Sequence, residues 1–226
     1  MQARQISPAE HLIRELYSIT NDYRLGFATQ LHRLLALGRE RLGMDIGIVA
    51  RVDGPTYHVV QAHLAGNGIV PSDKFDLAST YCERTLAADG PIGFVHAGSS
   101  EMRSHPAYAE FGLESYLGTP IRTAAGVFGT LNFSSSAPRD SPFDDVDVDA
   151  VQLMATWISG ELARRELVDR VRHIEALIPI CAECKQIRTA LGDWQQLEHY
   201  LGERADMEFT HGVCPDCEPM PSRRAD

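Results

Sequence analysis

The sequence of 226 residues lacks a long hydrophobic run: no apolar stretch approaches the roughly 18 residues that a membrane-spanning helix requires. Its first residues also lack the apolar core of a secretory signal, so we expect a cytoplasmic protein with no membrane partner. Positive charge is in short supply, because 31 acidic residues outnumber 21 basic ones and the net charge is −10. This balance excludes a broadly basic nucleic-acid binder and a polybasic membrane anchor.

Cysteine is also scarce, with five residues in the whole chain. A reducing compartment favours metal ligands, redox groups or buried thiols over disulfides. Four cysteines form two CxxC pairs, Cys181–Cys184 and Cys214–Cys217, with 29 residues between them. Two such pairs can place four thiolates around one Zn²⁺ ion, so we predict a structural zinc site with these four ligands. A reversible dithiol switch and an iron–sulfur cluster remain alternatives.

The hydrophobic pattern predicts a mixed fold of the α/β (α+β) class. Apolar residues spaced by three and four predict helices within about the first forty residues and over 75–86. Residues 104–111 are predicted to form a short helix or a loop. Runs rich in β-branched residues predict strands over 46–52, 57–64, 91–96, 115–123 and 127–134.

A long helix is predicted over residues 143–178, ending before Pro179. Its apolar positions follow a coiled-coil-like spacing of four and three residues, broken at Gly160 and Arg164. We expect its first half to pack on the sheet of its own chain and its second half to pair with a partner chain. Together with the N-terminal helices, it predicts a homodimer.

Three segments resemble a GAF domain: STYCERTLAADGPIGFVHAG (79–98), FGLESYLGTPIRTAAGVFGTLNFSS (111–135) and FDDVDVDAVQLMATWISGELAR (143–164). The resemblance covers roughly residues 10–168, and we assign residues 1–168 to this sensory domain. It implies a central antiparallel sheet flanked by helices and a long C-terminal signalling helix. GAF domains are sensory and regulatory modules that bind small molecules or dimerise.

The same resemblance indicates where a ligand would bind, although it leaves the ligand unknown. A helix that borders the GAF pocket would carry Tyr81 and Cys82, with further candidates nearby: His96, His105, Tyr108 and Tyr116. Each also has an ordinary structural interpretation, as a buried thiol, a hydrogen-bonded histidine or a packed ring. Serines follow Asn132 and Phe133, which departs from the cyclic-nucleotide-binding pattern, and no cysteine near the two histidines could attach a bilin.

The C-terminal segment resembles a cysteine module found on many bacterial signalling proteins. The shared elements are IPICAECKQIR at its start, GDWQQLEHY in the middle and FTHGVCPDC at its end. We assign residues 179–220 to a small zinc-ribbon-like module, which needs metal because so short a segment buries little apolar surface, and residues 221–226 to a tail. Ten acids against five bases in residues 175–226 favour a protein partner over nucleic acid.

The sequence therefore predicts a sensory and regulatory protein of bacterial signal transduction. Its GAF domain would sense a small ligand or a redox state, and the zinc module would relay this signal to a protein partner. No catalytic constellation is recognisable, so we expect no enzyme activity. One alternative is a thiol-dependent reductase that uses Cys82, with the CxxC pairs as electron donors. Another is a dimerisation module that binds no ligand.

Overall fold

The computed structural model describes residues 7–22, 24–65, 73–175, 178–189, 191–205, 208–210 and 213. The chain divides into two compact units, Met1–Leu167 and Val168–Asp226. Each unit is described by itself. Within the described residues, no helix combines the length and the apolar character needed to cross a membrane.

The first unit is built on a six-stranded antiparallel sheet with the order β3-β2-β1-β6-β5-β4. Its strands are β1 (Ile46–Asp53), β2 (Thr56–Leu64), β3 (Lys74–Asp76), β4 (Ile92–Phe94), β5 (Ser115–Thr123) and β6 (Gly126–Ser135). This is the antiparallel sheet flanked by helices that the sequence predicts. The central pair, β1 and β6, joins segments about eighty residues apart in the chain.

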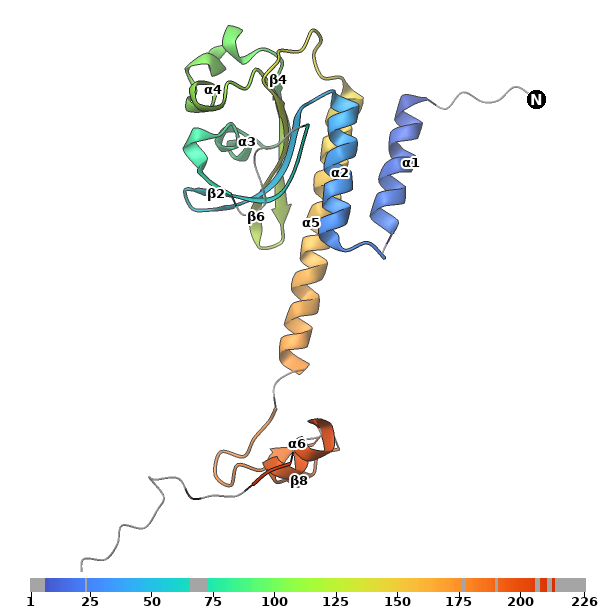
Figure 1. Ribbon diagram of the computed structural model, residues 1–226, viewed down its shortest axis with the longest axis vertical. Helices are drawn as coiled ribbons and strands as arrows, with labels where there is room; N and C mark the ends of the chain where they lie inside the picture. The colour runs from blue at the N-terminus through green and yellow to red at the C-terminus, as the bar shows by residue number, and fades with distance from the viewer. Residues whose placement is uncertain are drawn as a thin grey trace, which may run out of the picture. The chain divides into compact units, whose positions relative to one another are not determined.

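Helices α1 (Pro8–Asn21) and α2 (Phe27–Leu42) and the first part of α5 (Asp145–Glu175) lie on one side of this sheet (Figure 1). Ser7 caps α1 by accepting a hydrogen bond from the Glu10 amide, with Pro8 at the first helical position. The largest apolar cluster fills the space between helices and sheet, with Leu35, Phe133 and Val151 fully buried within it.

The other side of the sheet is covered by shorter elements (Figure 1). They are the 3₁₀ turns η1 (Leu77–Ser79), η2 (Ala97–Ser99) and η3 (Glu101–Ser104) and the helices α3 (Cys82–Ala87) and α4 (Pro106–Phe111). A second apolar cluster lies beneath them and includes Tyr57, Tyr81 and Tyr116.

The helix predicted over 75–86 is wrong in its first half. Residues 74–76 pair with β2 at the edge of the sheet, and α3 begins only at Cys82. The Asp76 carboxylate accepts a hydrogen bond from the Ala78 amide and so caps the intervening 3₁₀ turn. Local capping and edge pairing together override the helical spacing of the apolar residues.

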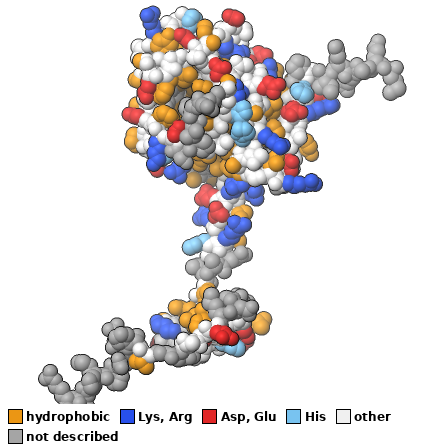
Figure 2. All heavy atoms as spheres, in the orientation of Figure 1, with side chains coloured by type: hydrophobic (Ala, Val, Ile, Leu, Met, Phe, Trp, Pro, Cys, Tyr) orange, Lys and Arg blue, Asp and Glu red, His pale blue; other side chains and the backbone are white. Residues whose placement is uncertain are grey.

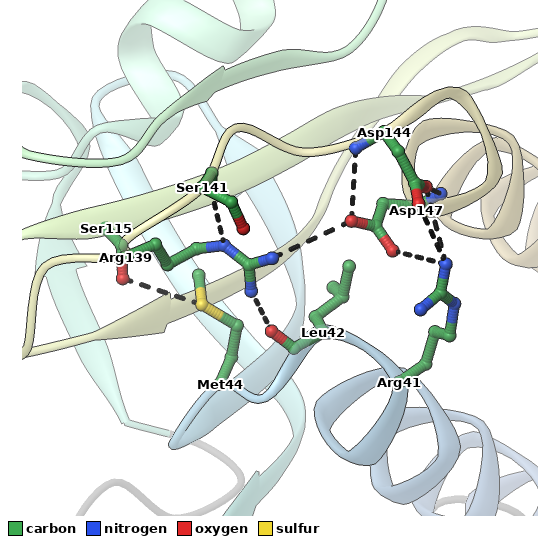
Figure 3. Close-up of polar contacts among 8 residues, drawn as sticks. All are labelled: Arg41, Leu42, Met44, Ser115, Arg139, Ser141, Asp144 and Asp147. Atoms are coloured by element: carbon green, nitrogen blue, oxygen red, sulfur yellow. Dashed lines mark hydrogen bonds and ion pairs between the residues drawn. The ribbon is translucent and has the colours of Figure 1, made fainter.

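The start of α5 is fixed by a buried carboxylate (Figure 3). The side chains of Asp144 and Asp147 accept hydrogen bonds from each other's amides, at 2.7 and 3.2 Å. Asp147 also pairs with Arg41 from the last turn of α2 at 3.0 Å and with Arg139 at 3.8 Å. Arg139 in turn donates to the Leu42 carbonyl. The capping box therefore ties the beginning of α5 to the end of α2.

The second unit contains a short hairpin of β7 (Ile187–Arg188) and β8 (Trp194–Gln195), followed by helix α6 (Leu197–Ala205). Ile187 is fully buried.

Candidate functional site

A cavity of about 160 Å³ lies between the sheet and the short elements that cover it. Strands of the sheet supply one part of its lining, and α3, α4 and the residues around them supply the other. The lining residues are Ile46, Ile48, Tyr57, Phe75, Thr80, Tyr81, Cys82, Ala107, Phe111, Leu113, Tyr116, Asn132 and Ser134. None of them is an acidic or basic side chain or a histidine.

Four of the lining residues form a hydrogen-bonded polar cluster: Tyr57, Cys82, Tyr116 and Asn132. The Asn132 amide nitrogen donates to the Tyr57 hydroxyl at 3.0 Å and to the Cys82 sulfur at 3.4 Å. The Cys82 sulfur lies 3.5 Å from the Tyr116 hydroxyl. That hydroxyl also lies 2.6 Å from the Oγ1 of Thr85. All four side chains are almost completely buried.

Burial keeps the polar cluster uncharged. It raises the pKa of both Tyr57 and Tyr116 well above the usual tyrosine value, because a phenolate would lose its hydration there. The same loss of solvation raises the pKa of the Cys82 thiol. At neutral pH the cluster therefore offers hydroxyl, thiol and amide groups for hydrogen bonding, and no ionised group.

The second unit carries a cysteine turn at the start of its hairpin. The amides of Cys184 and Glu183 donate hydrogen bonds to the Cys181 sulfur and hold its pKa below the usual thiol value. Lys185 follows with a positive φ of 62°, and the Cys181 amide donates to the Gln186 carbonyl at 2.8 Å. Amides directed at a thiolate and a tight reversal fit one half of a CxxC zinc site.

Cys214 and Cys217, the other two predicted ligands, lie outside the described residues. Over the described part of the chain, no three His, Cys, Asp and Glu side chains gather closely enough to hold a metal ion.

The family model for the GAF domain matches residues 27–162. The chain belongs to the GAF family. The match covers the sheet, α2 and the first half of α5, and thus the whole lining of the cavity. A search among curated proteins finds no match.

Several solved structures share this fold at low sequence identity. The GAF domain of an Acinetobacter phosphoenolpyruvate-protein phosphotransferase has a TM-score of 0.59 and 15% identity, covering 73% of this chain and 98% of its own. The chromophore-binding domain of an R. palustris bacteriophytochrome has a TM-score of 0.60 and 11% identity, covering 75% and 64%. The phycocyanobilin-bound GAF domain of a cyanobacterial phytochrome has a TM-score of 0.57 and 14% identity, covering 71% and 97%. At these identities the likeness establishes the fold alone.

Within the GAF domain, the six candidate pocket residues fall into two groups. Tyr81, Cys82 and Tyr116 line the cavity. The Tyr81 hydroxyl donates to the Leu113 carbonyl at 3.0 Å, and burial raises the pKa of Tyr81 to about 12.

The other three candidates do not line this cavity. His105 packs its ring 5.1 Å from that of Tyr81, and its Nδ1 accepts a hydrogen bond from the Ala107 amide, which caps α4. Tyr108 and His96 both approach Glu114, at 2.7 and 3.6 Å. Hydrogen bonds from the Gly98 amide and the Tyr108 hydroxyl lower the pKa of the Glu114 carboxyl. These contacts hold η2 and α4 to the start of β5.

Proposed function

We propose that this chain is a sensory and regulatory protein whose GAF domain binds a small molecule in the 160 Å³ cavity. The observation that carries the proposal is the buried polar cluster, whose four residues line the cavity. A concave, mainly apolar site with a few convergent polar groups is the usual form of a ligand pocket, although this one is small.

The sheet offers a direct route from the cavity to α5. Side chains alternate between the two faces of a strand, so neighbours on β5 and β6 belong to different clusters. Tyr116 and Asn132 line the cavity, whereas Leu117, Leu131 and Phe133 pack in the cluster beneath α2 and α5. A ligand that moves the first pair therefore displaces the second set, one sheet thickness away.

A thermal-shift screen of a compound panel tests the proposal, with a cavity-filling variant as the discriminating control. Ala107 on α4 is 1% exposed and lines the cavity, so Ala107→Leu should occupy the space. Ala109→Leu places the same side chain on the exposed face of the same helix. A ligand at a hundred times its Kd should stabilise the wild type by about 2.7 kcal/mol, and the Ala109 variant equally. If no compound distinguishes the wild type from the Ala107 variant, the ligand-free dimerisation module is the better description.

A bilin is a poor match for this GAF domain, although one of the similar structures is bilin-bound. An apolar cavity of about 150 Å³ accommodates benzene, so about 160 Å³ provides room for one ring and not for four linked pyrroles. We therefore propose a smaller ligand.

We further propose that Cys181, Cys184, Cys214 and Cys217 bind a structural zinc ion. The support is the Cys181 turn, whose amides already favour a thiolate. Bound zinc would crosslink the two CxxC pairs and supply folding energy. Metal analysis of the purified chain should give about one zinc per chain. The absence of metal, together with four freely titratable thiols, would contradict the proposal. Visible absorbance would indicate an iron–sulfur cluster instead.

A cytoplasmic homodimer with a further signalling partner completes the proposal. Leu167 and Val171 are more than half exposed on α5, and Ile13 and Tyr17 are exposed on α1. We expect truncation after Arg164 to weaken self-association in light scattering, and equal association of both forms would contradict this. On the face in Figure 2 acidic and basic side chains are interspersed over the described residues, which supports a protein partner rather than nucleic acid.

A reductase that uses Cys82 is the less favoured alternative. Its nucleophile would be the thiolate, which burial disfavours, and the cluster residues occupy the space around its sulfur. Any reductase activity that the Cys82→Ser variant retained would eliminate this function.

A further inference from the structure

We infer that the cavity takes an uncharged ligand of about one ring, with a single hydrogen-bonding group directed at the polar cluster. The inference rests on the proposed function, namely that this cavity binds a small molecule. We draw the inference from the volume of the cavity, from the charge of its lining and from the arrangement of polar and apolar residues in that lining.

The size limits the ligand to about one ring. The cavity measures about 160 Å³, and an apolar cavity of about 150 Å³ takes up benzene. Aromatic side chains of the lining already contact one another: the rings of Phe75 and Phe111 lie 5.7 Å apart, edge to face, and those of Tyr57 and Phe75 lie 6.3 Å apart. A planar ring can add to this group in the offset or edge-to-face geometries that aromatic pairs prefer.

The lining excludes an ionised ligand. Among the described residues that line the cavity, none carries a charge, because burial keeps Tyr57, Cys82 and Tyr116 protonated. A carboxylate, a phosphate or an ammonium group would lose its hydration there without gaining a counter-charge, which is far more costly than moving a neutral hydroxyl or amide.

Four polar side chains of the lining lie together, and they favour one polar position on the ligand. Tyr57, Cys82, Tyr116 and Asn132 are joined by hydrogen bonds of 3.0 to 3.5 Å. The remaining lining combines apolar residues with three hydroxyl-bearing ones, Thr80, Tyr81 and Ser134. The hydroxyls of Thr80 and Tyr81 already donate to the backbone carbonyls of Leu77 and Leu113. The apolar residues are Ile46, Ile48, Phe75, Ala107, Phe111 and Leu113. A ligand with one donor or acceptor at its end can bond to the polar cluster and contact the apolar residues as well, whereas a purely apolar ring offers the cluster no hydrogen bond.

A larger groove of about 650 Å³ between β5 and α5 does not compete for this ligand. Its lining includes Asp89, Arg122, Asp149 and Gln152, which are all exposed. Such a surface stays hydrated and provides no enclosed apolar wall.

Three probes of one ring size separate these requirements on the full chain at pH 7.5: phenol, toluene and benzoate. We expect phenol to bind with a Kd about tenfold lower than toluene, which corresponds to one hydrogen bond of about 1.4 kcal/mol, and benzoate not to bind. Binding is measured by NMR titration of the methyl groups of Ile46 and Ile48. The Ala107→Leu variant should lose the phenol response.

A matched pair of tyrosine variants tests the polar cluster. Tyr57→Phe removes the hydroxyl that accepts from Asn132 and should abolish the advantage of phenol over toluene. Tyr17→Phe makes the same change at a side chain that is 69% exposed on α1 and should leave the advantage intact.

The outcomes separate this inference from the proposed function. Benzoate binding as tightly as phenol, toluene binding as tightly as phenol, or no binding of any probe would each overturn the inference. If another class of compound stabilised the wild type but not the Ala107→Leu variant, the sensory function would stand and only the ligand chemistry would be wrong. If neither probes nor panel bound, both would fail.

Discussion

Two helical glycines in this GAF domain have opposite surroundings. Gly38 on α2 faces the Phe133 ring of β6 so closely that an added Cβ would overlap its Cζ and Cε1 atoms. Gly160 on α5 has no atom within 4 Å of the same position. The first glycine lets a helix approach the sheet, whereas no described neighbour of the second requires a glycine there.

These surroundings predict opposite effects of the same substitution. Gly38→Ala should lower the free energy of unfolding by about 1–3 kcal/mol, because the overpacked ring must move. Gly160→Ala should raise it by about 0.5–1 kcal/mol, because alanine has the higher helix propensity. Urea denaturation of both variants measures the difference. If both variants lost stability, a Cβ at Gly160 would have to meet a neighbouring atom, contrary to the structure.

Cys82 should resist alkylation in the native protein. Its sulfur is buried, its pKa is raised by desolvation, and only the thiolate reacts rapidly. With iodoacetamide at pH 7.5, we expect Cys82 to be modified at least tenfold more slowly than in urea-unfolded protein, as followed by peptide mass spectrometry. Equal rates in the two states would mean that the folded structure does not shield the Cys82 sulfur.

The sequence identifies only part of the cavity, and the reason is topological. Tyr81 and Cys82 are neighbours in the chain and fall within a family-like segment, so local pattern finds them. Tyr57 and Asn132 are not recognisable in this way, since they lie 75 residues apart and meet only because β1 lies between β2 and β6. His96 and Tyr108 lie near cavity-lining residues in the sequence. Their side chains nevertheless contact Glu114, which does not line the cavity.

At the scale of elements, the long strands at the centre of the sheet, which are buried over much of their length, are predicted well. The strand predicted over 115–123 is β5 with the same limits, and those predicted over 46–52 and 127–134 match β1 and β6 to within one residue. The three-residue strand β3 is not recognisable, because its pairing with Thr56–His58 is its main determinant. The other three-residue edge strand, β4 (Ile92–Phe94), lies within the strand predicted over 91–96, so β3 is the exception.

Asp147 is the buried carboxylate at the junction of α2 and α5, where the more exposed Asp144 also pairs with Arg41 at 3.4 Å. The Asp147 side chain is 5% exposed and pairs with Arg41 and Arg139 (Figure 3). Asp147→Ala should cost about 3–5 kcal/mol, because both guanidinium groups lose a buried partner and α5 loses its capping box. Asp149→Ala, at an exposed position on the same helix, should change stability by less than about 0.5 kcal/mol. Urea denaturation of the two variants measures this contrast; similar losses would mean that the Asp147 contacts contribute little.

For the whole molecule, histidines and carboxyl groups with lowered pKa values predict that stability falls in two steps as the pH decreases. Burial lowers the pKa of His63 and His105, and His63 also faces Arg39 and His32. As the pH decreases, both histidines therefore bind protons more readily in the unfolded chain than in the folded one. Stability consequently falls as the pH drops below 6.5. Glu114 and Glu161 have lowered pKa values because they accept hydrogen bonds, so their contribution is present above pH 4.5 and lost below it.

Variants of single histidines separate these steps. We expect the free energy of unfolding, measured in urea at pH 7.5, 5.5 and 4, to decrease at each stage. His63→Gln should reduce the loss between pH 7.5 and 5.5 and leave the second loss unchanged, because glutamine takes up no proton beside Arg39. His173→Gln, at an exposed position on α5, is the matched control and should behave as the wild type. If the His63 variant still lost as much stability between pH 7.5 and 5.5 as the wild type, this loss would belong to His105. The ring of His105 packs against Tyr81 at the cavity, so the loss of stability in acid would then be linked to the ligand pocket.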